Sequence, residues 1–132
     1  MTPRGVRLNN PGNIRLGRTL WQGEATAQSD PDFITFSDPV WGLRAIAVIL
    51  RHYQRMGLVT VRQMVGRWAP PSENDTDAYV KAVARGTGSL PDEPLDLAVP
   101  GHLVNIIQAI VLHENGEQPY DLDIIERAVG LA

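Results

Sequence analysis

The chain has 132 residues, a formal net charge of −3 and no cysteine, which excludes disulfides and thiolate metal sites. This length is enough for one domain with its own core, and no stretch is apolar enough for a secretory signal or a transmembrane helix. Four arginines precede the first acid, but in a chain with a single lysine they are few for binding nucleic acid. We therefore expect neither a membrane nor a nucleic-acid partner.

The first third of the chain is predicted to contain a small β element. Asn10-Pro11-Gly12-Asn13 is dense in turn-forming residues, and residues 14–16 then alternate apolar and basic side chains. Phe33–Phe36 has the composition of a partner strand, so we expect a small β-hairpin or sheet near the N-terminus. The amides of Asn10 and Asn13 suit sugar hydroxyl and acetamido groups, although asparagines in turns more often bond to their own backbone.

The rest of the chain is predicted to be helical, so the expected fold class is mainly α with a small β element. Ser37-Asp38-Pro39 indicates a helix start, because it places capping residues directly before a proline in the first turn. Gly57 ends that helix, and Thr60 caps a shorter one. Expected helices cover residues 39–56, residues 61–68, a segment that ends near Arg85, residues 103–115 and residues 121–129.

The segment before Arg85 contains several capping residues in succession. Pro70-Pro71 prevents the preceding helix from continuing, and Ser72 or Asn74 can cap the next helix with Asp75 or Asp77 in its first turn. Capping is the more frequent use of such side chains, so we expect it for at least one of Asn74 and Asp75.

The same segment also allows a functional interpretation. Glu73, Asn74 and Asp75 would then form the polar rim of a groove. Trp68 or Tyr79 would stack against a sugar ring in that groove, because aromatic rings combine a large apolar face with a polar edge. Mutation separates the two interpretations, since a cap contributes to stability and a rim residue contributes to binding.

Leu103–Gly116, with the sequence LVNIIQAIVLHENG, is predicted to be the central helix. Its apolar side chains would cover every side of the helix, so we expect burial all round. Gly116 supplies the left-handed residue expected just past a helix C-terminus. Glu114, in the last turn, is then placed at the edge of the core and is our first candidate for catalysis. The alternative is a helix-end glutamate that only bonds to neighbouring backbone.

Other catalytic chemistries find no matching motif. The three histidines are scattered without an HExxH pattern, and the chain contains no GxSxG elbow, no cysteine nucleophile and no glycine-rich phosphate loop. What remains is carboxylate chemistry on a neutral, hydroxyl-rich substrate, with no metal and no cofactor.

Four motifs together resemble small phage and prophage virion proteins, often described only as structural proteins: RGVRLNNPGNIR, Trp21-Gln22-Gly23, RWAPPSENDTDAYV and HENGEQPY. These proteins in turn resemble lysozyme-like peptidoglycan glycosidases, in which a catalytic glutamate ends a buried helix and an asparagine-rich β segment follows. In this chain the asparagine-rich segment comes first. The resemblance therefore implies a single lysozyme-like domain over residues 1–132 that is circularly permuted.

The resemblance also implies roles for particular positions. Glu114 matches the general acid of the glycosidases, Asn10 and Asn13 match polar positions of the β segment, and Tyr79 lies where a tyrosine often lines the groove. Because nearly the whole chain separates them, these segments must meet in space. We expect the Glu114 carboxylate to open into a cleft and to lie within about 10 Å of the Asn10 or Asn13 side chain.

Further positions complete the expected groove. Trp21 or Tyr120 would close one wall. No position clearly matches a second carboxylate, and the available residues are Glu24, Glu73 and Asp75. A lytic transglycosylase would suit this gap, because a hydroxyl of the sugar itself closes an anhydro ring and no enzymic nucleophile is needed.

The resulting functional hypothesis is a peptidoglycan-degrading glycosidase, of the lysozyme or lytic transglycosylase type, associated with a phage virion. It would act in the bacterial periplasm or cell wall, with glycan strands and other virion proteins as partners. The alternative hypothesis is a non-catalytic virion structural or cell-wall-binding module on a lysozyme-like scaffold.

Overall fold

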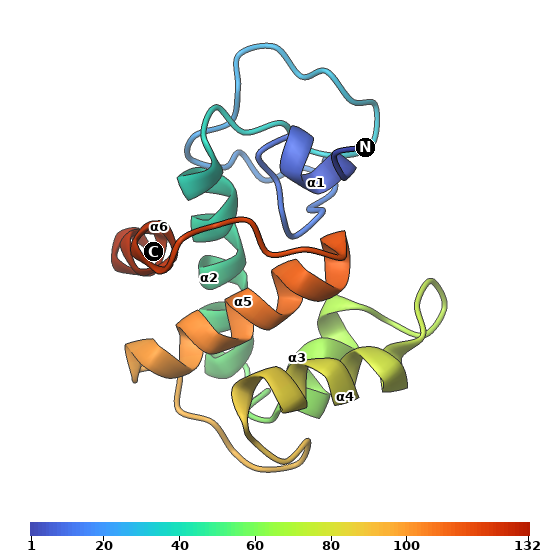
Figure 1. Ribbon diagram of the computed structural model, residues 1–132, viewed down its shortest axis with the longest axis vertical. Coiled ribbons are helices and arrows are strands. Elements are labelled where there is room, and N and C mark those ends of the chain that lie inside the picture. The colour runs from blue at the N-terminus through green and yellow to red at the C-terminus, as the bar shows by residue number, and fades with distance from the viewer.

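The chain forms six helices joined by loops, and the fifth helix runs through the middle of the molecule (Figure 1). The computed structural model describes residues 1–132. The mainly helical class expected from the sequence is confirmed. The helices are α1 (Arg4–Arg7), α2 (Pro39–Arg55), α3 (Val61–Trp68), α4 (Thr76–Thr87), α5 (Pro100–Asn115) and α6 (Leu122–Leu131). None of them combines the length and apolar character needed to cross a bilayer.

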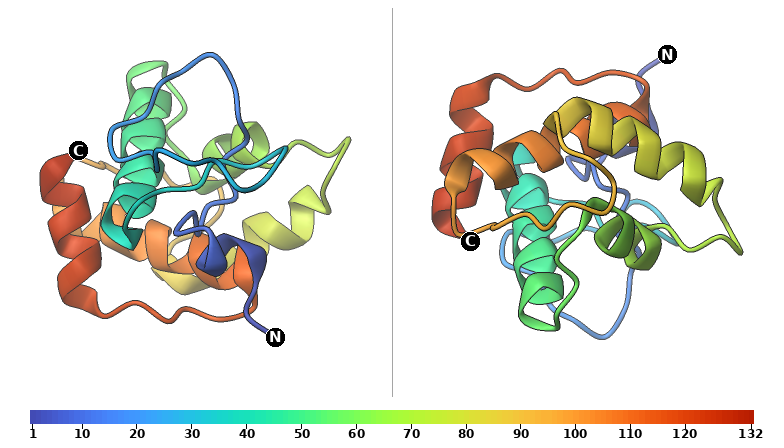
Figure 2. Two further views of the ribbon diagram at one scale, coloured as in Figure 1. Left: turned by 90° about the horizontal axis from the view of Figure 1, so that it is seen from above. Right: turned by 90° about the horizontal axis from the view of Figure 1, so that it is seen from below.

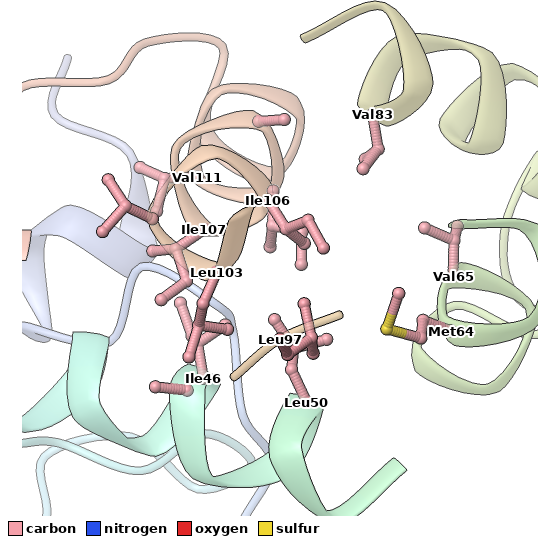
Figure 3. Close-up of a cluster of buried hydrophobic side chains, with 14 of the residues drawn as sticks. Ile46, Leu50, Met64, Val65, Val83, Leu97, Leu103, Ile106, Ile107 and Val111 are labelled. Atoms are coloured by element: carbon pink, nitrogen blue, oxygen red, sulfur yellow. The ribbon is translucent and has the colours of Figure 1, made fainter. Parts of the chain in front are cut away.

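Helix α5 organises the core because apolar residues occupy most of its surface. It packs against α1, α2, α4 and α6, and residues of all five helices from α2 to α6 join one large buried cluster. Figure 3 shows side chains of α5 facing those of α2, α3 and α4 around Leu97. Among them are Leu103, Ile106, Ile107 and Val111 of α5, Ile46 and Leu50 of α2, Met64 and Val65 of α3, and Val83 of α4.

Burial of α5 on every side was too broad an expectation. Leu112 is 52% exposed, and Asn105 is exposed as well. These two residues are seven positions apart, so they lie on one stripe of the helix. That stripe faces solvent, whereas most of the remaining surface of the helix is covered by neighbouring elements.

The helix ends follow the local signals in the sequence. Asp38 caps α2 by accepting a hydrogen bond from Val40 N, and Thr60 forms a capping box with Gln63 at the start of α3. Gly116, with φ of 73°, ends α5 in the left-handed conformation. These three predictions are confirmed.

The cap of α4 differs in detail from the prediction. Asp75 is the N-cap, and its Oδ1 accepts a hydrogen bond from Ala78 N at 3.2 Å. Asn74 donates instead to the carbonyl of Pro70, at 3.3 Å. Ser72, Asn74 and Asp75 are all good caps, so the sequence alone could not choose among them. The expectation that at least one of Asn74 and Asp75 is a cap is confirmed.

The predicted β element is present only in reduced form: the two predicted segments pair at Arg15 and Phe33, but no regular hairpin or sheet forms. Residues 4–7 form the short helix α1, and the later segments meet only at isolated antiparallel bridges, Arg15 with Phe33 and Glu24 with Phe36. Asn9 and Asn13 have φ of 55° and 50°, so the chain turns sharply at the predicted turn before it reaches the paired segment. Backbone pairing is therefore confined to single residue pairs.

The N-terminal segment lies against the C-terminal end of α5. Figures 1 and 2 show α1 and the loop after it beside that end in each view. The contact is made by hydrogen bonds from Asn13 to Glu114 and from Asn115 to the carbonyl of Pro11. Residues at opposite ends of the chain thus become neighbours.

Candidate functional site

Glu114 is held by two hydrogen bonds from other parts of the chain. Asn13 Nδ2 donates to its Oε1 at 2.9 Å, and the hydroxyl of Tyr79 donates to its Oε2 at 2.8 Å. Asn13 and Glu114 are 101 positions apart in the sequence. The expectation that Glu114 lies within about 10 Å of Asn10 or Asn13 is therefore confirmed through Asn13. Glu114 does more than bond to neighbouring backbone.

Tyr79 approaches Glu114 from the interior. It lies on α4, is 1% exposed, and its ring stands 3.9 Å from the ring of His113, centroid to centroid. Burial raises the pKa of Tyr79 well above its usual range, and the charge and hydrogen bond of Glu114 add to this effect. The hydroxyl therefore stays protonated and serves as a donor. Tyr79 is too buried to stack against a sugar, so that part of the groove hypothesis does not apply to it.

Asn10 supports the loop that presents Asn13. Its side chain is fully buried, accepts from Ile14 N at 2.9 Å and donates to the carbonyls of Ile14 and Ile34. An amide with these bonds has no donor left for a sugar. Asn10 therefore holds the turn in place, and it does not face the cleft as we expected.

Asn115 and Gly5 fasten this turn to α5, and no sequence pattern indicates their role. Asn115 Nδ2 donates to the carbonyls of Pro11 and Val111, at 2.8 and 2.9 Å. A Cβ at Gly5 would lie 2.5 Å from Asn115 Oδ1 and 2.9 Å from Asn13 Oδ1. Only glycine therefore leaves room for both asparagines. The alignment of Asn13 with Glu114 depends on this close contact.

A cleft of about 380 Å³ opens beside Glu114. Its lining comes mainly from two groups of residues. The segment before α2 supplies amide and guanidinium groups together with Ile14 and Phe33, and α2 and α3 supply further apolar and aromatic side chains. Lining residues include Arg4, Asn13 and Arg15 from the first group, Ile49, Tyr53 and Trp68 from the second, and Glu73 and Asn74 from the loop before α4. A small, partly open pocket with a few converging polar groups is typical of a ligand site.

The comparison with known proteins places the chain among phage proteins. No protein-family model matches it. Protein P5 of Pseudoalteromonas phage PM2 is 41% identical over 129 residues, which make up 94% of this chain and 78% of that protein. The chain belongs to the family of phage protein P5. The resemblance to phage proteins is thus confirmed, and the name of the relative specifies neither an activity nor a substrate.

Four of the predicted groove residues of this P5-family chain line the cleft together with Glu114: Asn13, Trp68, Glu73 and Asn74. Of the three candidates for a second carboxylate, only Glu73 is among them. Asp75 caps α4, and one oxygen of Glu24 accepts from Trp21 N at 2.6 Å. The carboxylates of Asp75 and Glu24 therefore each accept a hydrogen bond from a nearby backbone N–H group.

The two aromatic residues expected to close a wall of the cleft do not line it. Trp21 packs against a small separate cluster formed by Ile34, Phe36 and Ala45. Tyr120 packs against the main core, and its hydroxyl is buried without a hydrogen-bond partner. Burial raises the pKa of Tyr120 to about 12, with a smaller contribution from Glu117. The aromatic wall comes from other residues.

Tyr53 and Phe33 contribute aromatic surface to the cleft that sequence reasoning missed. The sequence pattern predicts a strand at Phe33, and Tyr53 falls within the helix expected over residues 39–56. Arg4 and Arg15 were also missed, because alternating arginines near a turn look like solvent-facing positions. No short-range pattern indicated that these residues share one cleft.

Proposed function

We propose that this chain cleaves peptidoglycan glycan strands as a phage virion-associated glycosidase or lytic transglycosylase, with Glu114 as the general acid. One observation carries the proposal: a carboxylate at the end of the central helix, held by Asn13 and Tyr79, lines a cleft that also contains aromatic rings and amide groups. Sugars present apolar ring faces and polar edges, so this pairing suits them.

The neighbours of Glu114 are compatible with proton transfer. To act as a general acid, Glu114 must give its proton to the glycosidic oxygen as the bond to C1 breaks. The Tyr79 hydroxyl can donate to the ionised carboxylate and accept from the protonated one, because a hydroxyl has both capacities. Tyr79 can thus hold the side chain in one place through both protonation states.

The second step of the reaction depends on what attacks C1. Glu73 is the one other acid on the cleft, and it is exposed on the loop before α4. Without a nucleophile beside Glu114, a hydroxyl of the same sugar can attack C1, close an anhydro ring and return its proton to the Glu114 carboxylate. If Glu73 activates a water instead, the product is a reducing sugar. The absence of a second acid tied into the site favours the anhydro product.

Turbidity of a peptidoglycan suspension tests the proposal. The wild type should clear the suspension, and Glu114→Gln should abolish clearing because the amide keeps the shape and loses the transferable proton. Glu117→Gln is the matched control, since it makes the same change three positions along, at an exposed residue that does not line the cleft. Mass spectrometry of the products separates an anhydro sugar from a reducing one, which is heavier by one water. Clearing by the Glu114→Gln variant would contradict the assignment.

A second candidate function is a non-catalytic virion or cell-wall-binding module. It is favoured by one feature of the site: both oxygens of Glu114 are engaged by side chains that join three distant segments, as in a purely structural clamp. Such a module would pellet with insoluble peptidoglycan and release no sugars. In that case Glu114→Gln would lower stability and leave pelleting intact.

A further inference from the structure

Two arginines lie against one aromatic ring at the mouth of the cleft. The guanidinium carbon of Arg4 is 3.6 Å from the centroid of the Phe33 ring, and that of Arg15 is 4.8 Å from it. All three residues line the cleft that contains Glu114. Stacking on an aromatic ring restrains a guanidinium group and leaves its N–H donors free at the edge.

The backbone holds this arrangement in register. Arg15 and Phe33 form an antiparallel bridge, flanked by hydrogen bonds from Ile34 N to Ile14 O and from Leu16 N to Asp32 O. Phe33 itself is 7% exposed, so the ring is a fixed support. The two charges are therefore placed by the fold before any ligand arrives.

Neither arginine has a carboxylate partner. The three ion pairs of the protein involve Arg62 and Lys81 with acids around α3 and α4. Asp30, whose charge Arg4 influences, accepts hydrogen bonds from the backbone N–H groups of Asp32 and Phe33. Glu73, on the loop before α4, lines the same cleft but forms no ion pair with Arg4 or Arg15. Two restrained cations thus face the cleft without a counter-charge in contact.

We propose that Arg4 and Arg15 bind a carboxylate of the substrate, so that the cleft selects acidic glycan strands over neutral ones. This inference rests on the proposed function. Both arginines line the same cleft as Glu114, so the carboxylate would belong to the part of the strand that this cleft holds. A planar guanidinium group matches a carboxylate with two parallel hydrogen bonds.

Peptidoglycan offers carboxylates from two sources. In intact strands the lactyl carboxyl is amide-bonded and the charges are on the peptide stems, whereas peptide-free strands expose the lactyl carboxylate itself. Binding is measured in a Glu114→Gln parent, so that no strand is cut, with three probes of equal length. The probes are peptide-bearing fragments, peptide-free fragments and neutral chitin oligosaccharides.

We expect at least one acidic probe to bind about tenfold or more tightly than chitin, with an advantage that shrinks as salt is added. Arg4→Gln and Arg15→Gln should each weaken that binding about tenfold and leave chitin binding unchanged. Arg18 lies in the same segment but outside the cleft lining, so Arg18→Gln should change neither the binding of the acidic probes nor the binding of chitin. The acidic probe that loses affinity identifies the source of the carboxylate.

The outcomes separate this inference from the proposed function. Equal affinity for acidic and neutral probes, at low and high salt, overturns the carboxylate subsite and leaves glycan cleavage standing. Failure to bind any of the three probes overturns the proposed function together with the subsite. If the glutamine variants do not fold, Arg4→Lys and Arg15→Lys keep the charge and the packing stem, and the salt dependence of the parent decides the question.

Discussion

Replacing Tyr79 by phenylalanine removes one hydroxyl and leaves the ring packed against His113. The hydroxyl donates to Glu114 Oε2 at 2.8 Å, and a hydrogen bond to a charged group contributes about 1.5–3 kcal/mol. The carboxylate still faces the cleft, where water can replace the lost donor, so we expect the lower end, about 1.5 kcal/mol, in the free energy of unfolding. Glu114 also loses one of the two contacts that position it, and we expect turnover to fall about tenfold.

Urea melts and peptidoglycan clearing measure the two effects on the same variant. Tyr120→Phe is the control, because its hydroxyl is buried without a partner and its removal should change stability by less than about 0.5 kcal/mol, or increase it. A Tyr79→Phe variant with unchanged stability and unchanged turnover would refute the role of this hydrogen bond. Equal destabilisation by both variants would show that any lost hydroxyl has this effect.

Three further predictions address the ionisation of the tyrosines, the cap of α4 and the packing at Gly5. The raised pKa of Tyr79 and of Tyr120 keeps both side chains protonated in the folded state above pH 10, where the unfolded chain has lost these protons. The free energy of unfolding, measured by urea melts, should therefore fall with rising pH by up to about 1.4 kcal/mol per pH unit for each tyrosine. Asp75→Ala should lower the free energy of unfolding by about 1 kcal/mol, whereas Asn74→Ala should weaken glycan binding with less loss of stability. A loss of stability with Asn74→Ala and a loss of binding with Asp75→Ala would reverse the two roles. Gly5→Ala should lower the free energy of unfolding, measured by a thermal or urea melt, by about 1–3 kcal/mol, because the new Cβ would lie 2.5 Å from Asn115 Oδ1. An unchanged melt would show that the asparagines can move aside.

Helices α2 to α6 could be predicted because their signals are local, whereas the short helix α1 was missed. Asp38 before Pro39, Thr60 three residues before Gln63, and Gly116 after the last turn of α5 each act within one helical turn. The extent of the β element could not be predicted, because it depends on contacts that are not local. Arg15 does pair with Phe33, but the side chain of Asn10 binds the N–H of Ile14 and the carbonyl of Ile34, so the pairing does not extend into a regular strand.

Part of the candidate site could also be predicted. Glu114 follows from a buried helix that ends in a polar turn, and its contact with Asn13 was expected only because the resemblance implied that the two segments meet. Tyr79 was expected near Glu114, but its buried hydrogen bond to the carboxylate and the roles of Asn115 and Arg4 could not be inferred, because they depend on how α4 and α1 pack against the end of α5. No periodicity in the sequence encodes such packing.

The chemistry of the two sides of the cleft bears on how a sugar would be oriented at Glu114. Tyr53 and Trp68 offer apolar faces, and Asn13 offers an amide next to the carboxylate. A sugar ring stacked on the aromatic side would turn its hydroxyl groups and glycosidic oxygen toward the amide side, where Glu114 lies. Such orientation accounts for a large share of the barrier reduction in reactions that need one well-placed acid. A cleft with polar groups on every side would bind the same sugar in several orientations, most of which would leave the glycosidic oxygen away from Glu114.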